Sequence, residues 1–205
     1  IKDKNIPETD FWFLKLNSDG EILINKTYGG SGDDRGQSLI EMLDGGFLLI
    51  GYSKSSDGDG SRNQGFHDNW IIRIDFQGKI IWEKSVGFSG HDHAYSIIKT
   101  QDGGFFITGF LDVTASNGAG DFEKEINSRH GVGEFWGHKL NSQGKIVWSR
   151  FFGGSNNDRS YDVIETQEGG FIMVGSTESN DFDISNNFGS YDFWVIKIDK
   201  KGTLI

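Results

Sequence analysis

The chain has 205 residues, including 30 Gly, one Pro and no Cys, and its formal net charge is −10. The absence of Cys excludes disulfide bonds and thiol catalysis. The acidic balance argues against nucleic acid as a partner, because neutralising phosphates needs a surplus of Lys and Arg. Aromatic residues make up 14% of the chain, enough for a folded core, and no apolar run approaches the length of a membrane span.

In chain order, the first predicted elements are two short strands within residues 10–29. A full unit of four short strands follows, with no segment showing the 3.6-residue apolar period of a helix. Its first turn is Asp-Gly-Gly and its second ends in Gly78, and both compositions suit tight reversals that need positive φ. The strands of this unit are expected at residues 38–43, 47–52, 70–75 and 79–86.

The four-stranded unit recurs along the chain. Trp12, Trp70, Trp136 and Trp194 are separated by 58, 66 and 58 residues, and the phrase Asp/Glu-Gly-Gly-Phe keeps the same step. Four antiparallel strands in tandem repeats of this size are typical of a β-propeller. The fold prediction is therefore all-β, a β-propeller of which about three and a half blades are present. The half blade is residues 10–29, and the blades are residues 37–87, 95–152 and 161–205.

Other repeated β folds fit this pattern less well. Repeats of a parallel β-helix are much shorter, and a Greek-key sandwich has no reason to repeat internally. Kelch repeats share the double Gly but have a period of roughly 50 residues. An independent domain of this size would be marginal on surface-to-volume grounds. Because a partial propeller leaves strand edges exposed, the chain is expected to be a piece of a longer protein.

Topology sorts the connections into two ends. The turns at one end have nearly the same sequence in every unit. At the other end lie the loops between the second and third strands and the links between units, which are polar and vary in sequence and length, as binding surfaces usually do. Within the links an Asp recurs, and a basic residue follows it. The Asp either accepts backbone hydrogen bonds or contributes to a ring of charges at the channel mouth, and its repetition favours the first interpretation. These candidate ligand-binding pairs are Asp34 with Arg35, Asp92 with His93, and Asp158 with Arg159.

Three further features bear on ligands. His91 and His93 form a His-x-His pair, for which the sequence offers no evident third metal ligand. Solvent-exposed aromatic residues suited to stacking on sugars would come from Phe66, Phe122 and Tyr191. The loop within residues 112–133 alone departs from the repeat, and it is the best single place for a ligand site. Its candidate ligand-binding residues are Asp121, Glu123, Arg129 and His130.

Two loops share the pattern D-x-D-x-S-x-N-x-G and have an Asp at the twelfth position. Oxygen ligands at positions 1, 3, 5, 7 and 12 are the spacing of calcium loops. The pattern departs from such loops at position 6, which is Arg62 or Asn186 rather than Gly. The alternative is a pair of Asx-rich loops satisfied by their own backbone. The predicted ligands of structural Ca²⁺ are Asp57, Asp59, Ser61, Asn63 and Asp68 in one loop and Asp181, Asp183, Ser185, Asn187 and Asp192 in the other.

Two other recurring features are interpreted as structural. A basic residue follows each repeat Trp by three positions and is expected to pair with neighbours such as Glu41 or Glu165. The Trp side chains are expected to pack between blades. The basic residues are Lys15, Arg73, Lys139 and Lys197.

Taken together, Gly-Gly-Ser-x-x-Asp, Asp-Gly-Gly-Phe and D-x-D-x-S-x-N-x-G-x-x-D-x-W resemble repeats of large secreted and surface proteins of Bacteroidetes, many of which carry type IX secretion sorting domains. The resemblance covers essentially the whole chain. It implies an extracellular or outer-surface propeller used in binding or adhesion, and it carries no established catalytic residues.

Two functions remain open at the level of the sequence. The first is a non-catalytic extracellular binding or scaffold domain that presents variable polar loops to a protein or glycan. The second is a propeller-type carbohydrate-active enzyme, a glycosidase or lyase, that uses carboxylates at the channel mouth. Catalysis needs carboxylates in unlike environments, whereas Asp34, Asp92 and Asp158 occupy equivalent places, so the non-catalytic function is favoured.

Overall fold

The computed structural model describes residues 9–112 and 133–205. The described residues form thirteen strands and no helix, so the all-β prediction is confirmed for them. The strands are β1 (Phe11–Leu16), β2 (Ile22–Tyr28), β3 (Asp34–Glu41), β4 (Phe47–Ser53), β5 (Asp68–Ile74), β6 (Ile80–Val86), β7 (His93–Lys99), β8 (Phe105–Leu111), β9 (Glu134–Leu140), β10 (Ile146–Phe152), β11 (Asp158–Glu165), β12 (Phe171–Thr177) and β13 (Asp192–Ile198).

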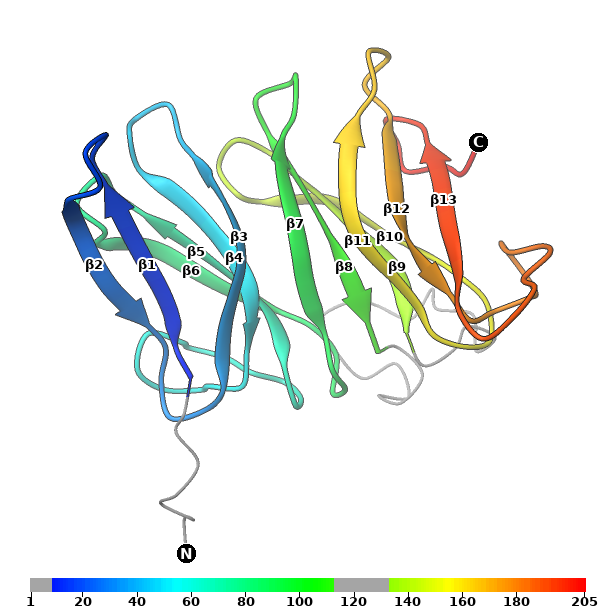
Figure 1. The fold of residues 1–205 in the computed structure, drawn as a ribbon, viewed down its shortest axis with the longest axis horizontal. Coiled ribbons are helices and arrows are strands. Elements are labelled where there is room, and N and C mark those ends of the chain that lie inside the picture. The colour runs from blue at the N-terminus through cyan, green and yellow to red at the C-terminus, as the bar shows by residue number, and fades with distance from the viewer. Residues whose placement is uncertain (1–8, 113–132) are drawn as a thin grey trace, which may run out of the picture.

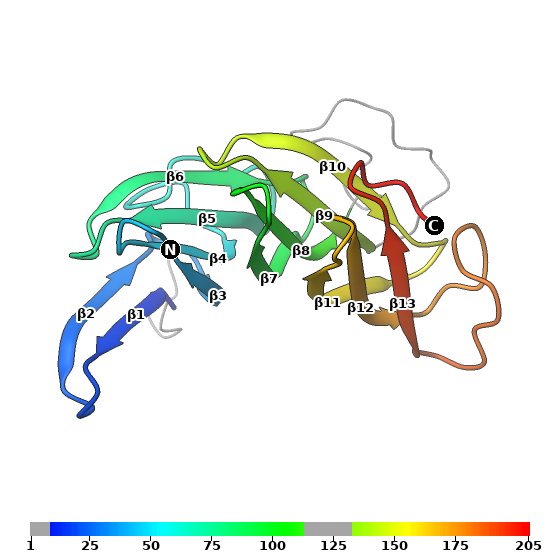
Figure 2. The ribbon, with the colours of Figure 1, turned by 90° about the horizontal axis from the view of Figure 1, so that it is seen from above.

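These strands form four antiparallel sheets, and neighbours in the chain are neighbours in each sheet. The first sheet is β1-β2, the second β3-β4-β5-β6, the third β7-β8-β9-β10 and the fourth β11-β12-β13. The sheets follow one another around an open arc (Figures 1 and 2), with β3, β7 and β11 on its concave side and β6 and β10 on its convex side. Leu204 near the C-terminus forms an isolated antiparallel bridge with Ile198 of β13.

The core lies between consecutive sheets. Side chains alternate along a strand, so Leu48 and Ile50 of β4 pack toward the third sheet, whereas Phe47 and Leu49 pack toward the first. This two-sided burial explains why β4 reads as an unbroken apolar run. Burying each such side chain contributes about 1.5–3 kcal/mol, so the interfaces between sheets account for much of the stability.

We term β3, β7 and β11 the inner strands, because they lie on the concave side of the arc. Each of them begins earlier in the sequence than its apolar residues suggest. β3 starts at Asp34 rather than residue 38, because it pairs with β4 through a β-bulge between Gly36 and Ser38. The same bulge recurs in β7 and in β11. In β3 and β11 the residues before the bulge are polar or Gly and give no apolar signal, yet they pair within the sheet.

The repeat Trp residues pack between sheets with one exception. Trp70 and Trp136 are fully buried, and Phe11 of β1 meets Trp70 edge-on with ring centroids 4.9 Å apart. Trp12 is 68% exposed, and its indole N–H donates to Asn25 on the neighbouring strand. The packing prediction was therefore wrong for Trp12, which faces an open groove.

Two of the basic residues on the third strands pair with carboxylates, but the partners differ from the predicted Glu41 and Glu165. Arg73 of β5 donates to Asp44, with Nη2 and Oδ1 2.6 Å apart, and Lys139 of β9 donates to Asp102 at 2.9 Å. Both acids belong to Asp-Gly-Gly turns, so each pair fastens a turn to the adjacent strand.

Candidate functional site

The polar end of the sheets is organised around the recurring Asp of each link. Asp34, Asp92 and Asp158 are fully buried at the first position of the inner strand or one residue before it. Asp158 accepts hydrogen bonds from Gly154 N–H at 2.8 Å, from Ser179 Oγ at 2.9 Å and from Thr177 Oγ1. Its carboxylate therefore holds the link and the following loop together.

The second sheet repeats this arrangement with Asp34. This carboxylate accepts from Gly30 N–H at 2.8 Å, from Ser55 Oγ at 2.7 Å and from Ser53 Oγ. In the third sheet, Asp92 accepts from Phe88 N–H and from Asp112 N–H. Burial raises the pKa of the Asp92 carboxyl well above its usual range, although these two hydrogen bonds act in the opposite direction. Burial likewise raises the pKa of Asp158.

The D-x-D loops bind backbone donors of the link that precedes their own sheet. In the first loop, Asp57 Oδ1 accepts from Ser31 N–H at 2.7 Å and Asp59 Oδ2 accepts from Gly29 N–H at 3.2 Å. Asn63 donates to the Ser53 carbonyl at 2.6 Å. These bonds fix the loop against the link at the polar end.

The second loop makes the equivalent bonds. Asp181 Oδ1 accepts from Ser155 N–H at 2.8 Å, and Asp183 Oδ2 accepts from Gly153 N–H at 3.1 Å. Asn187 donates to the Thr177 carbonyl at 3.2 Å. Among the described residues, the group of at least three His, Asp or Glu side chains close enough to share an ion does not include these acids. The two calcium sites stay a prediction.

The remaining predicted calcium ligands serve nearby parts of the same loops. Ser61 Oγ donates to Glu83 of β6, and Asp68 Oδ2 accepts from Gln64 N–H at 2.8 Å. In the second loop, a pocket of about 330 Å³ lies against the side chains that end the motif. Its polar lining includes Ser185, Asn187 and Asp192.

The basic residues after the recurring Asp lie along the inner strands and contact aromatic rings. His93 stacks on Tyr52 of the preceding sheet, with ring centroids 3.8 Å apart and nearly parallel planes. Arg159 lies over Phe110 of its preceding sheet at 5.0 Å. Arg35 pairs with Asp33 at 3.0 Å and has a half-exposed side chain. The concave side thus carries arginine side chains beside aromatic and imidazole rings.

Three histidines meet where the second and third sheets join. His67 precedes β5, His91 lies in the link after β6, and His93 begins β7. One ligand nitrogen from each lies within 4.8 Å of the others, and the Nδ1 atoms of His67 and His91 are 2.9 Å apart. The sequence supplied the His-x-His pair, and folding adds the third side chain that the pair lacked.

Sequence analysis missed His67 because 24 residues separate it from His91. The two are joined by a parallel β-bridge, and Gly133 and Asn157 form the corresponding bridge one repeat later. The repeat itself contained the signal. In both repeats the residue before the third strand (His67 or Gly133) lies beside the residue before the recurring Asp of the next link (His91 or Asn157). Pairing these two positions would have identified His67.

Two of the three histidines, His67 and His93, are held in uncharged form at neutral pH. Burial, with the neighbouring His67 and His91, lowers the pKa of His93 to about 3. Burial also lowers the pKa of His67, and His91 adds to the effect. Uncharged imidazoles are the form that binds metal ions.

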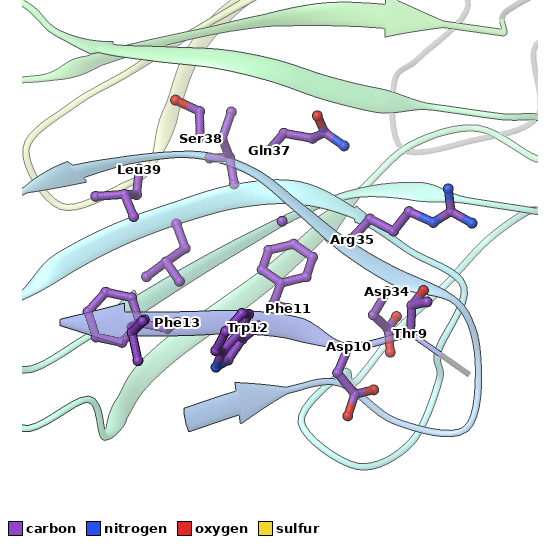
Figure 3. Close-up of a pocket in the computed structure, with 14 residues that line it drawn as sticks. Thr9, Asp10, Phe11, Trp12, Phe13, Asp34, Arg35, Gln37, Ser38 and Leu39 are labelled. Carbon is purple, nitrogen blue, oxygen red and sulfur yellow. The ribbon is translucent and has the colours of Figure 1, made fainter. Parts of the chain in front are cut away.

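A separate groove of about 850 Å³ opens between β1 and β3. Figure 3 shows Phe11, Trp12 and Phe13 of β1 in this groove together with Leu39 of β3. Asp34 and Arg35 also line it, and they are the predicted ligand-binding residues found there. The predicted residues Asp121, Glu123, Arg129 and His130 lie outside the described residues.

Comparison with known proteins leaves the family open. No protein-family model and no curated protein matches this chain. A solved structure of a protein of unknown function from Bacteroides caccae is similar to it, with 13% sequence identity, a TM-score of 0.35, and coverage of 95% of this chain and 73% of the other. In the part of the chain that the structure describes, no helix has the length and apolar character to cross a membrane.

Proposed function

We propose that this chain is part of a β-propeller that acts as a non-catalytic binding or scaffold domain on the outer surface of a bacterium or outside the cell. Its partner is a protein or a glycan that contacts the polar end of the sheets. The resemblance to repeats of Bacteroidetes surface proteins supports the location, and the repeated four-stranded units support the propeller.

The row of arginine and aromatic side chains on the inner strands carries this proposal. Tyr95 and Tyr161 are the extra residues of the β-bulges in β7 and β11, two residues after His93 and Arg159. The Tyr95 hydroxyl lies 3.2 Å from His93 Nδ1. The Tyr95 and Tyr161 rings lie 5.5 Å apart, and Tyr161 is 48% exposed. Exposed aromatic rings beside cations suit a glycan with acidic groups, because the rings stack on sugars and the cations pair with carboxylates or sulfates.

The carboxylates of the links favour binding over catalysis. A glycosidase needs two carboxyl groups in unlike environments, one protonated and one ionised. Asp34 and Asp158 instead occupy matching networks of backbone and hydroxyl donors. These donors fix both carboxylates as part of the framework.

The test is binding of neutral and acidic oligosaccharides to the 205-residue chain, measured by calorimetry. Tyr161→Ala and Arg159→Gln are expected to weaken binding at least tenfold, because each removes a stacking or pairing group from the inner strands. Phe76→Ala is the matched control, since Phe76 is an exposed aromatic residue in the turn at the opposite end.

Two results would contradict the proposal. One is equal loss of binding in the Phe76 and Tyr161 variants, which would move the contact away from the inner strands. The other is cleavage of an oligosaccharide, detected by new reducing ends or unsaturated products, which would support the carbohydrate-active enzyme instead.

A further inference from the structure

We propose that His67, His91 and His93 bind one divalent transition-metal ion of the Zn²⁺ type, and that this ion joins the second sheet to the third. The site goes beyond the proposed binding function and does not depend on it. Its three ligands come from two neighbouring sheets, so an ion bound there would cross-link their polar ends.

The backbone fixes the three histidines close together without help from an ion. His67 accepts a hydrogen bond at its carbonyl from Asp92 N–H at 2.7 Å, and the bridge between His67 and His91 sets these two residues side by side. Phe66 N–H donates to the Gly90 carbonyl at 3.0 Å, one residue away on each segment. The ligands are therefore preorganised, and binding would not require the loops to fold around the metal.

Among residues 9–112 and 133–205, two buried ring nitrogens of this cluster find no hydrogen-bond partner, namely His67 Nε2 and His93 Nε2. Leaving a buried polar atom without a partner costs about 1–3 kcal/mol. A metal ion removes part of this cost, since coordination satisfies one nitrogen directly and orients the ring so that its other nitrogen meets a second group.

The surroundings assign a ligand atom to each ring. His93 Nδ1 lies 3.2 Å from the Tyr95 hydroxyl, so donation of Nδ1–H to Tyr95 leaves the lone pair on Nε2 for the metal. His67 Nε2 faces the negative Asp33 carboxylate at 3.7 Å, which favours the proton on Nε2 and leaves Nδ1, the atom beside His91, for the metal. His91 Nδ1, the neighbour of His67 Nδ1, completes the set.

The spacing of the nearest two ligand nitrogens is compatible with a small tetrahedral ion. Zn–N bonds of about 2.0–2.1 Å place two nitrogen ligands roughly 3.3 Å apart in a tetrahedron. The Nδ1 atoms of His67 and His91 are 2.9 Å apart, so a slight opening of this pair accommodates the ion. Three nitrogen ligands favour Zn²⁺, Ni²⁺, Co²⁺ or Cu²⁺ over Ca²⁺ and Mg²⁺, which prefer oxygen.

Positive and negative side chains around the cluster have opposite effects on a bound cation. Arg35, Lys54 and Arg159 lie near enough to lower the pKa of one or more of these histidines, and they also repel a bound cation. Asp33 partly offsets them, because its carboxylate faces His67. A water molecule in the fourth position would leave the ion open to a further ligand.

The experiment is titration of the EDTA-treated 205-residue chain with Zn²⁺, followed by calorimetry and thermal melting, and with Co²⁺, followed by visible absorption. The expected result is one ion per chain, a rise in the melting temperature, and a Co²⁺ spectrum of tetrahedral type. His91→Asn is the main variant because His91 is exposed, so this change leaves the core intact. It is expected to weaken Zn²⁺ binding at least tenfold.

Two further variants separate coordination from packing. Tyr95→Phe removes the hydroxyl that orients His93 and is expected to weaken binding by about tenfold, the usual lower bound for such a partner. Phe66→Leu is the matched control, because the Phe66 ring stacks on His91 with centroids 5.0 Å apart but offers no ligand atom. It is expected to bind Zn²⁺ as the unaltered chain does. Absence of binding at millimolar Zn²⁺, or equal binding by the His91 variant, would overturn the site.

Discussion

Single residues at the polar end of the sheets act mainly through buried hydrogen bonds. Asp158 illustrates this, because its carboxylate joins a backbone amide of the link to two hydroxyl groups of the next loop. The recurrence of Asp was visible in the sequence. Which donors it meets was not, since Thr177 and Ser179 lie 19 and 21 residues away and are brought near only by strand pairing.

Replacement of Asp158 by Ala is expected to lower the free energy of unfolding by about 3 kcal/mol, because it leaves buried donors without an acceptor. Urea unfolding followed by tryptophan fluorescence measures this change. Asp19→Ala in an exposed turn is the control and should change stability by less than about 0.5 kcal/mol. An Asp158 variant that kept full stability but lost a ligand would show that this carboxylate serves binding instead.

At the scale of elements, the sequence predicted strands well where both faces are apolar and poorly where pairing depends on geometry. β4 was expected at residues 47–52 and is Phe47–Ser53, because every residue in it is buried. β3 was expected four residues too late, since Asp34, Arg35 and Gly36 enter the sheet through a bulge. Apolar patterning does not record a bulge of this kind.

In the third sheet, the turn between the first two strands is stabilised by a charged pair that depends on pH. Partial burial acts to raise the pKa of Asp102, but hydrogen bonds from Lys139, Thr100 and Gly104 N–H outweigh it and lower the pKa to about 2. The carboxyl of an unfolded chain titrates near pH 3.9. Stability from this pair is therefore complete above about pH 4 and is lost as the pH falls toward 2.

Lys139→Met is expected to reduce the loss of stability between about pH 4 and pH 2, because Asp102 then titrates closer to its unfolded value. Thermal melting across this range measures the effect, which is small because Asp102 is largely exposed. Lys79→Met in an exposed turn is the control for removing one positive charge. Identical acid dependence in the two variants would rule out the pair as its cause.

The predicted calcium binding of the two D-x-D loops can be tested through its effect on the melting temperature. If Ca²⁺ binds there, the melting temperature of the chelator-treated chain is expected to rise at millimolar Ca²⁺, the affinity range of extracellular calcium modules. The double variant Asp59→Ala, Asp183→Ala should lose this rise. A chain that shows neither binding heat nor a shift in melting temperature leaves the backbone hydrogen bonds of Asp59 and Asp183 as the role of these side chains.

Across the whole molecule, the same contact joins each sheet to the next. The last strand of one sheet lies against the turn between the third and fourth strands of the following sheet. Tyr28 donates to the Gly78 carbonyl at 2.6 Å, and Lys84 donates to the Gly144 carbonyl at 3.0 Å. The repeat period was readable from the sequence, but this contact was not, because it links residues 50 and 60 positions apart through the curvature of the arc.

Gly103 and Gly144 have the same backbone conformation but different surroundings. Replacing each of them therefore distinguishes the energetic cost of the turn from that of the contact between sheets. Gly103 has a φ of 79° and no atom within 4 Å of the place that an added Cβ would occupy, whereas Gly144 has a φ of 74° and Trp82 of the preceding sheet 2.5 Å from that place. Alanine in this left-handed region costs about 1–2 kcal/mol by itself. Gly103→Ala is therefore expected to destabilise the chain by about this amount.

Gly144→Ala adds a collision with the Trp82 ring and is expected to cost at least about 1 kcal/mol more, since relieving an overpacked contact typically requires about 1–3 kcal/mol. The difference between the two variants, measured by urea unfolding, isolates the contact between the second and third sheets. Trp82→Leu in the Gly144→Ala background should recover part of the difference, because it makes room for the added methyl group. Equal destabilisation by the two alanines would show that neighbouring sheets do not press on each other at this turn, and the repeated docking of strand on turn would then not determine how the sheets are spaced.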